Sequence, residues 1–470
     1  MKKNDVLLVL SALAFSALFY QQAPGINFLL FTLMATIVSL FMNPVSLREN
    51  QLWLYFLACN LSGFAVFAVN SDLSILACLL SLLVYSSKIL NKQNSTLLCG
   101  ALGAYSVITS LFYFFIAFSE RHSSSSSKKS QWKLGLSLVA SVLITMVFFT
   151  LYKNSNPLFS TFTQFINLKW LSFGWICFTI FGFFILHGLY RSKNIEVLNT
   201  LDTKARYKIA HQTGQDADER YSQIMGYVLF TALNLMLFVL NLLDINNLFI
   251  HPIMPEGITL SDFVHEAVLN TVLSIVLAVG LIMWLFKGNF NFTRSGKTVR
   301  YLVYLWIIQS FVVVFNAIIR NIRYVNEYQL SQQRIGVFVF LGLCIAGLCL
   351  TCIKLSQQQS TWQLITQNVQ LWFMTIVFLS LFNWDKFITN YNITHSGDHK
   401  PLDKIYLLSL SDANIPELAE LHQARKLNAY EDSLFYKKCE ASDKKNRFRQ
   451  WPSFNLRMYQ NQKTIHLLKD

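Results

Sequence analysis

Charged residues are scarce in this chain of 470 residues. Asp, Glu, Lys and Arg together make up 14% of it, whereas hydrophobic residues make up 53%. Soluble proteins carry roughly a quarter charged residues, so the composition excludes a chain that stays in water on its own. Proline is also rare, with 8 residues, whereas phenylalanine occurs 40 times. This combination favours long lipid-facing helices over a soluble sheet domain.

Motifs of soluble catalysis and of nucleic-acid recognition are missing from the sequence. It has no P-loop, no GxSxG, no kinase signature and no zinc-finger spacing. His265-Glu266 lacks the second histidine of a zinc protease, because position 269 is leucine. These absences lower the expectation of an enzyme without excluding one. We expect no metal, no cofactor and no nucleic-acid partner.

Cysteine occurs eight times, and the positions argue against disulfides. Seven cysteines lie in apolar runs, and only Cys439 lies in the C-terminal region. Thiols in lipid-embedded helices behave as small hydrophobes. Cys349 and Cys352 form a CxxC pair, but it lies in an apolar segment without a neighbouring histidine. We therefore predict packing roles and no disulfide framework.

Apolar runs long enough to span a membrane recur along most of the chain. A spanning helix needs ~20 apolar residues, and twelve candidates lie at 6–20, 26–42, 52–69, 73–90, 96–118, 132–152, 172–190, 224–246, 263–286, 300–322, 334–353 and 362–382. The first resembles a signal peptide, but no small-residue cleavage site follows Tyr20. The sequence predicts an all-α integral membrane protein with about 12 transmembrane helices and a small, mainly helical C-terminal tail.

Composition predicts four regions. They are N-terminal membrane helices (1–118), a Ser/Lys linker (119–131), a main membrane bundle (132–382) and a soluble C-terminal tail (383–470). The linker holds five consecutive serines followed by two lysines. The tail is the only region polar enough to fold in water. Within it we expect helices near 403–410 and 416–441.

Loop charge predicts the orientation in the membrane. Loops 119–133, 191–223, 287–300 and 354–361 hold 15 Lys or Arg, and loops 153–171, 247–262 and 324–334 hold 3. Lys and Arg concentrate in cytoplasmic loops, so the first set should be cytoplasmic and the tail should lie outside. Counting back to the N-terminus places Lys2 and Lys3 outside, which conflicts with this rule and indicates a miscounted early segment.

Three successive candidate spans carry polar residues at helical spacing. Polar groups inside lipid are costly and need partners or water, so these stripes are the best functional pointers. The topology brings one end of each span to the same side of the membrane, as it does the tail. We predict a shared polar chamber there, formed by Asn241, Asp244, Asp262, His265, Glu266, Asn316, Arg320, Arg323, Arg334 and Asp385.

Some of these residues would occupy the same positions without any chamber. Arginines near helix ends extend to the lipid headgroups, and carboxylates at a helix N-terminus are favoured by the helix dipole. For Asn234 and Gln309, hydrogen bonding between helices is the better interpretation. His265 beside Glu266 also suggests a proton relay, because histidine titrates near neutral pH.

A series of short segments resembles a known family. They are Gly25-Ile26-Asn27-Phe28-Leu29-Leu30-Phe31, Leu260-Ser261 to Val264-His265-Glu266, Leu285-Phe286-Lys287-Gly288-Asn289-Phe290-Asn291-Phe292, Leu305-Trp306-Ile307-Ile308-Gln309, Arg334-Ile335-Gly336-Val337, Asn383-Trp384-Asp385 with Asn390-Tyr391-Asn392, and Leu407-Leu408-Ser409-Leu410-Ser411. In this order they resemble a bacterial membrane-protein family catalogued as a domain of unknown function, the 4173/4153 group of Bacteroidota. The resemblance implies a multi-pass protein of the bacterial inner membrane and assigns no activity, and the loop charges then predict a tail in the periplasm. Ser310 departs from the asparagine expected there.

Two functions are compatible with these patterns. The first is transport or permeation of a small solute through the polar chamber between the eighth and tenth candidate spans. The alternative is a membrane-anchored signalling or assembly component that binds an unknown protein partner through its tail, with Leu418 and Leu421 on an amphipathic helix. An intramembrane enzyme using His265 and Glu266 ranks third. The lipid bilayer is the one partner that both main hypotheses require.

Overall fold

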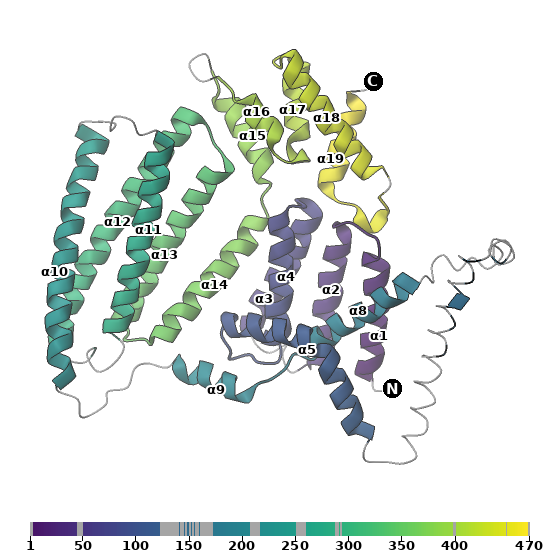
Figure 1. The fold of residues 1–470 in the computed structure, drawn as a ribbon, viewed down its shortest axis with the longest axis horizontal. Helices are drawn as coiled ribbons and strands as arrows, with labels where there is room; N and C mark the ends of the chain where they lie inside the picture. The colour runs from purple at the N-terminus through teal and green to yellow at the C-terminus, as the bar shows by residue number, and fades with distance from the viewer. Residues whose placement is uncertain are drawn as a thin grey trace. The chain divides into compact units, whose positions relative to one another are not determined.

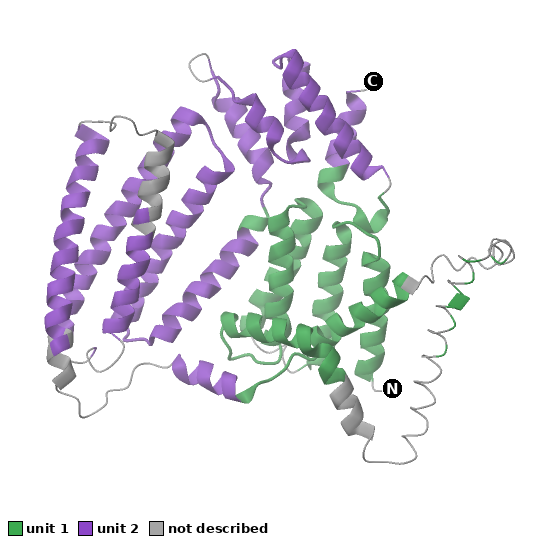
Figure 2. Ribbon diagram, viewed as in Figure 1, with its two compact units in different colours: residues 1–196, 379–381, 448–458 green, residues 197–378, 382–447, 459–470 purple. Residues whose placement is uncertain are grey.

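The computed structural model describes residues 3–44, 50–122, 173–206, 217–250, 260–286, 291, 294–397, 401–447 and 449–468, with isolated positions between 141 and 159. These residues form helices and no β-strand, which confirms the all-α prediction. The chain divides into two compact units (Figure 2). Unit 1 comprises 1–196, 379–381 and 448–458, and unit 2 comprises 197–378, 382–447 and 459–470.

Unit 1 is a helical bundle with a short segment from the C-terminal region. Its helices are α1 (Lys3–Phe19), α2 (Ile26–Met42), α3 (Asn50–Ala68), α4 (Asp72–Lys88), α5 (Thr96–His122) and α8 (Phe173–Tyr190). Consecutive helices from α2 to α5 pack as neighbours, and α8 packs on α1 and α5 (Figure 1). Ser71 begins α4 with a capping box, exchanging hydrogen bonds with Ser74.

A segment near the C-terminus completes unit 1. It contains the short helix η7 (Trp451–Ser453). The Phe454 carbonyl oxygen accepts a hydrogen bond from the Ile26 amide at 2.7 Å, and Ser453 Oγ accepts one from the Ala23 amide at 2.8 Å. A Cβ added at Gly25 would lie 2.5 Å from the Phe454 oxygen. Glycine is therefore required for this close approach, for which the sequence gives no signal.

The membrane part of unit 2 is built around one long helix, α12 (Arg294–Tyr328). It packs against α10 (Ala217–Ile245), α11 (Leu260–Leu285) and α13 (Gln332–Ser356), which Figure 1 shows side by side with it. Their apolar faces form one core that includes Phe230, Ile282, Phe286, Val303, Ile307, Leu341 and Leu348. The short α9 (Glu196–Ala205) precedes these helices, and α14 (Thr361–Ser380) follows them.

The tail part of unit 2 has a core of its own. Its helices are α15 (Trp384–His395), α16 (Lys404–Ser409), η6 (Asp412–Asn414), α17 (Ile415–Gln423), α18 (Ala429–Asn446) and α19 (Leu456–Leu467), the last shared with unit 1 at its start. Buried side chains from these helices, among them Ile388, Leu407, Leu418 and Phe435, pack together with Val325 and Leu330. The predicted helix at 403–410 matches α16.

The predicted helix at 416–441 is two helices. Arg425 has a φ of 53°, which ends α17 in the left-handed conformation. Its amide donates to the His422 oxygen at 2.9 Å, and the Lys426 amide donates to the Leu421 oxygen at 3.0 Å. This pair of bonds is a Schellman motif, which satisfies the last carbonyls of a helix. The sequence conceals the break because arginine rarely takes this conformation.

The number of membrane spans is smaller than predicted. Five helices of the described residues are long and apolar enough to cross a membrane: Gln51–Ala68, Thr96–Phe114, Gln223–Ile250, Gly296–Tyr328 and Gln332–Ser356. Counting Thr361–Ser380 and Trp384–His395, which meet at a 65° bend, as one span gives six. The count of about 12 is thus not supported.

Helix length explains most of this correction. Helices α1, α2 and α4 have 17 residues each, which is about 26 Å at 1.5 Å per residue and less than the ~30 Å of a bilayer core. The apolar helices Gly174–Tyr190 and Leu273–Leu285 are also short in the part described. The predicted run 132–152 and the linker from residue 123 onward lie outside the described residues, apart from isolated positions.

Candidate functional site

Polar side chains of α10 and α12 meet along the contact between these two helices. We call this set the polar seam: Asn234, Asn241 and Asp244 on α10 with Gln309, Asn316, Arg320 and Arg323 on α12. Steps of seven, three and four residues keep each set on one helical face. The local sequence therefore creates two polar stripes, and the packing of α10 on α12 brings the stripes together.

Amide side chains link the two helices in the part of the polar seam that precedes the Asp244–Arg320 pair along both helices. Gln309 Nε2 donates to Asn234 Oδ1 at 2.7 Å. Asn234 Nδ2 donates to the Leu302 carbonyl oxygen of α12 at 3.0 Å and to the Phe230 oxygen of its own helix at 2.6 Å. Further along α10, Asn241 Nδ2 donates to the Gln309 carbonyl oxygen at 3.2 Å. The predicted hydrogen bonding between Asn234 and Gln309 is confirmed.

An ion pair lies near the C-terminal end of α10. Arg320 Nη2 of α12 donates to Asp244 Oδ1, and the two side chains are 14% and 17% exposed. Beyond it, α10 continues into a π-helical turn, η4 (Asn246–Ile250). Arg323 Nη2 donates to the Leu248 carbonyl oxygen in this turn at 2.5 Å. Two of the predicted arginines therefore reach α10, and π-helical turns are frequent at functional sites.

Some buried polar atoms of the polar seam have no hydrogen-bond partner in the described part of the chain. They are Asn241 Oδ1, Gln309 Oε1 and Asn316 Nδ2. Asn241 and Asn316 are 6% and 4% exposed, so neither reaches bulk water freely. A buried polar atom without a partner costs about 1–3 kcal/mol. The polar seam thus has hydrogen-bonding capacity for water or for a polar solute.

The polar seam is as long as a membrane is thick. On α12 it extends from the Leu302 carbonyl group to the Arg323 side chain. These positions are 21 residues apart in sequence, which corresponds to about 32 Å along a helix. The hydrocarbon core of a bilayer is ~30 Å thick. The row of polar contacts between α10 and α12 is therefore about as long as a bilayer core is thick.

Arg334 lies away from the polar seam. Its Nη1 donates to the carbonyl oxygens of Tyr328, at 2.6 Å, and of Gln329, and its guanidinium lies 4.0 Å from the centre of the Tyr324 ring. These contacts close the turn between α12 and α13. Arginine near a helix C-terminus satisfies the last carbonyl groups, so the structure gives Arg334 a capping position.

Asp385 also lies away from the polar seam. Its Oδ1 accepts a hydrogen bond from Gln332 Nε2 at 2.5 Å. Its Oδ2 accepts one from the Ser411 amide at 3.1 Å and another from the Ser411 hydroxyl. Asp385 therefore connects α15 to the start of α13 and to the turn after α16. Because both partners are far away in sequence, its spacing from the other charges did not predict this position.

Three predicted residues of the chamber belong to the start of α11. The backbone of Asp262, His265 and Glu266 is helical, as their spacing predicts. Their side chains lie outside the described residues. A role for them in lining a chamber or relaying protons therefore stays a prediction.

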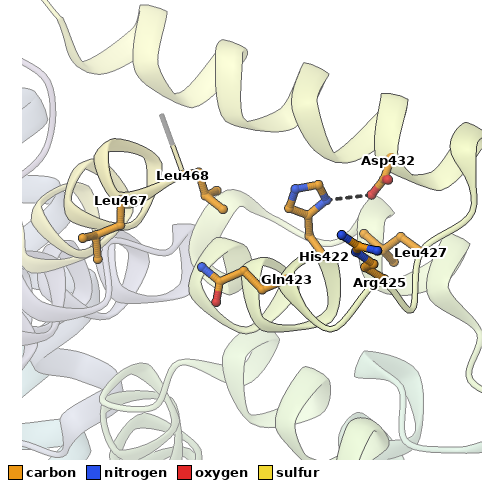
Figure 3. A pocket seen from close by; sticks show the side chains of 7 residues that line it. All are labelled: His422, Gln423, Arg425, Leu427, Asp432, Leu467 and Leu468. Carbon is orange, nitrogen blue, oxygen red and sulfur yellow. Dashed lines mark hydrogen bonds and ion pairs between the residues drawn. The ribbon is translucent and has the colours of Figure 1, made fainter. Parts of the chain in front are cut away.

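The tail contains a pocket that the sequence did not indicate. It has a volume of about 600 Å³ and is lined by His422, Gln423, Arg425, Leu427, Asp432, Leu467 and Leu468 (Figure 3). Figure 3 shows His422 and Asp432 facing each other, with His422 Nδ1 2.9 Å from Asp432 Oδ1. Tyr436 bonds the other ring nitrogen at 3.1 Å. These residues come from α17 and α18, so only the fold of the tail brings them together.

A buried lysine joins the helices of the tail. Lys438 Nζ donates to the carbonyl oxygens of Leu408 at 3.2 Å and Leu410 at 2.9 Å, and to Asn414 Oδ1 at 2.8 Å. Removal from water lowers the pKa of Lys438 to about 8, although the nearby Asp385 carboxylate acts in the opposite direction. Lys438 therefore holds the end of α16 and η6 against α18.

Comparison with known proteins defines the family and no activity. The family model of a domain of unknown function, DUF4153, matches residues 55–421. No curated protein and no solved structure matches the chain. The matched range includes α10 to α17 almost completely, and so contains the whole polar seam. The chain belongs to the DUF4153 family.

Proposed function

We propose that this protein moves a small polar solute across a membrane along the polar seam between α10 and α12. The observation that carries the proposal is the row of polar contacts over about 32 Å of α12, with Asn241, Gln309 and Asn316 each keeping a buried atom without a partner in the described part of the chain. Hydrogen bonds between polar side chains also hold membrane helices together without any transport, but such contacts need no spare donors or acceptors. A row that extends through the core, with spare donors and acceptors, fits a path for polar molecules better.

The Asp244–Arg320 pair is the gate in this proposal. The ion pair joins α10 to α12 near the end of α10, where it would close the polar seam to a solute. Separating the two side chains exposes a carboxylate, which attracts positively charged groups, and a guanidinium, which attracts negatively charged groups. Breaking a partly buried ion pair is costly unless water or solute replaces the lost partner. Solute entry and opening of the gate would therefore be coupled.

Vesicles that contain the purified full-length protein test the proposal. We expect glycerol or glycine to enter them faster than it enters protein-free vesicles, as followed by stopped-flow light scattering. Asn316→Leu removes a spare donor of the polar seam, and should return entry toward the protein-free rate. The matched control is Phe315→Leu, because Phe315 is the neighbouring residue of α12 and is 54% exposed. Equal rates for wild type, Asn316→Leu and protein-free vesicles would contradict the proposal.

The loop charges and the family resemblance support a bacterial inner membrane as the location. The Lys and Arg of loops 191–223 and 287–300 favour the cytoplasm. In this proposal the end of α10, the Asp244–Arg320 pair and the tail face the periplasm. The solute would then meet the gate from the outside.

A signalling or assembly role for the tail is the second candidate. The tail has its own core and a pocket of about 600 Å³, and it exposes the aromatic side chains of Tyr430 and Tyr436, at 64% and 53%. Exposed tyrosines are enriched where proteins bind one another. Photo-crosslinking from position 430 in intact cells should then capture a discrete partner, and the same probe at position 463, on α19, is the matched control. The same products from both positions would contradict this role.

A further inference from the structure

Two basic side chains converge on the turn that follows α11. Lys354 of α13 donates from Nζ to the Phe286 carbonyl oxygen at 3.2 Å, and Asn291 Nδ2 donates to the same oxygen at 2.8 Å. Arg300 of α12 donates from Nη2 to the Asn291 carbonyl oxygen at 2.7 Å. We call Arg300, Lys354 and Asn291 the basic cluster.

The basic cluster has no carboxylate near it on α12 or α13 to balance its charge. The sequence contains no Asp or Glu between Glu266 and Glu327, or between Glu327 and Asp385. The cluster therefore cannot take a counter-charge from α12 or α13 at this end of the bundle. Within the described ranges, Arg300 and Lys354 donate to backbone carbonyl oxygens. Carbonyl dipoles satisfy donors, but they do not neutralise two full charges.

Most of the donors of Arg300 and Lys354 lack acceptors among the described residues. A guanidinium has five N–H donors and an ammonium has three, and one hydrogen bond from each is present. Arg300 Nε is buried without a partner in the described part of the protein. Lys354 is 1% exposed, so its charge is almost completely removed from water. Burying cations without a counter-ion costs free energy. An anion bound at Arg300 would lower this cost for both Arg300 and Lys354.

The position of the basic cluster selects the class of anion. It lies where α11 ends, α12 begins and α13 ends, at the end of the apolar stretches Gly296–Tyr328 and Gln332–Ser356. Trp362, near the start of α14, donates from Nε1 to Asp202 at 2.7 Å, and tryptophan is enriched at the level of lipid headgroups. Phosphate groups lie at this depth, and the guanidinium fork fits phosphate oxygens.

We propose that Arg300 and Lys354 form a binding site for a phosphate group, carried by an anionic lipid headgroup or present as free phosphate. Arg300, which is partly exposed, contacts the phosphate oxygens through its guanidinium group. Lys354, whose Nζ donates to the Phe286 oxygen, contributes its positive charge. Gln358, whose Nε2 lies 3.4 Å from the Asn291 carbonyl oxygen, borders the site. The site does not depend on solute movement through the polar seam.

Binding to the purified full-length protein in a neutral detergent tests the proposal. The two probes are phosphatidylglycerol, followed by native mass spectrometry, and inorganic phosphate, followed by isothermal titration calorimetry. Arg300→Gln should weaken binding of the active probe about tenfold, the loss expected for one charge-assisted hydrogen bond. Lys297→Gln is the control, because it removes the same charge from an exposed position one turn away on α12.

Each outcome decides the proposal. Binding of phosphatidylglycerol alone identifies a lipid site, binding of phosphate alone identifies a site for a free anion, and loss of either in Arg300→Gln supports the assignment. An equal loss in Lys297→Gln would reduce the effect to general surface charge and overturn it. Absence of binding by both probes overturns it as well. If Arg300→Gln does not yield folded protein by circular dichroism, Arg300→Lys replaces it, because lysine keeps the charge but loses the Nε donor and the planar fork.

Discussion

Asp244 and Arg320 form an ion pair between α10 and α12 although they are 76 residues apart in sequence. Each lies on the polar face that its own helix presents to the other. The pair is mostly buried, with 17% and 14% of the side chains exposed. Its position at one end of the polar seam makes it both the gate of the proposed path and the most direct test of how the two helices are held together.

The two members of this pair should be energetically coupled, so that removing both costs less than the two separate losses added together. Asp244→Asn leaves Arg320 without its counter-charge, and we expect a loss of about 2–4 kcal/mol. The double variant Asp244→Asn with Arg320→Gln should lose less than the sum of the single variants, because no unpaired charge remains. Unfolding of the four proteins in mixed micelles with increasing SDS measures this. Additive losses would show that the two side chains do not interact.

Gly25→Ala should detach the C-terminal segment 448–458 from unit 1. The new Cβ would lie 2.5 Å from the Phe454 oxygen and 2.6 Å from the Ser453 carbonyl carbon, and both are backbone atoms that cannot rotate away. We expect a loss of more than ~1 kcal/mol and faster limited proteolysis near Trp451. Gly336→Ala is the matched control, because nothing lies within 4 Å of the added Cβ in α13.

The control should move in the opposite direction. Alanine in a helix interior is favoured over glycine by up to ~1 kcal/mol, so Gly336→Ala should be neutral or stabilising. A similar loss of stability in both variants would mean that the contact between Gly25 and Phe454 is not the cause.

The stability of the tail should rise with pH because of Lys438. Its pKa is lowered from 10.5 to about 8 in the folded protein by burial. The unfolded chain therefore binds more protons between pH 8 and 10.5, and the free energy of unfolding increases across this window. Below pH 8 the cost of burying the charged amine is fully present. A shift of this size corresponds to about 3 kcal/mol at most.

Comparison with a variant isolates this contribution. Lys438→Met lacks the titrating amine, so the difference in the free energy of unfolding between wild type and variant should grow in favour of wild type from pH 8 to pH 10.5. Denaturant unfolding of the full-length protein, followed by hydrophobic-dye binding, provides the measurement. A difference that is constant across this window would show that Lys438 titrates at its ordinary pKa.

Cysteine labelling should place the tail relative to the membrane. Cys439 is only 6% exposed and should react slowly with a membrane-impermeant thiol reagent on either side. Tyr430→Cys introduces a thiol at a position that is 64% exposed. We expect labelling of this variant in intact spheroplasts, because the distribution of Lys and Arg among the loops predicts that the tail lies outside. Labelling only after lysis would place the tail and the Asp244–Arg320 gate on the cytoplasmic side.

Regular patterns in the sequence predicted the part of the fold that depends on local spacing. Few charges and many apolar runs indicated membrane helices, and the intervals between Asn234, Asn241 and Asp244 placed these residues on one face. The predicted number of membrane spans was too high because it counted apolar runs whose helices are short. Helices α1, α2 and α4 have 17 residues each, and an apolar run does not reveal whether its helix crosses a bilayer or packs as a short element.

The sequence by itself determined the two polar stripes and the all-helical class, because helical periodicity is a local property of the chain. The tertiary structure alone decided which residues meet. It forms the ion pair between Asp244 and Arg320. It also places the Arg334 guanidinium on the Tyr328 carbonyl oxygen at the end of α12, and the Asp385 carboxylate on the Ser411 amide. It also brings Phe454 next to Gly25, and it brings Arg300 and Lys354 to the Asn291 and Phe286 carbonyl oxygens after α11. Such contacts depend on how helices pack over long separations in sequence, and charge or spacing alone does not encode a unique partner.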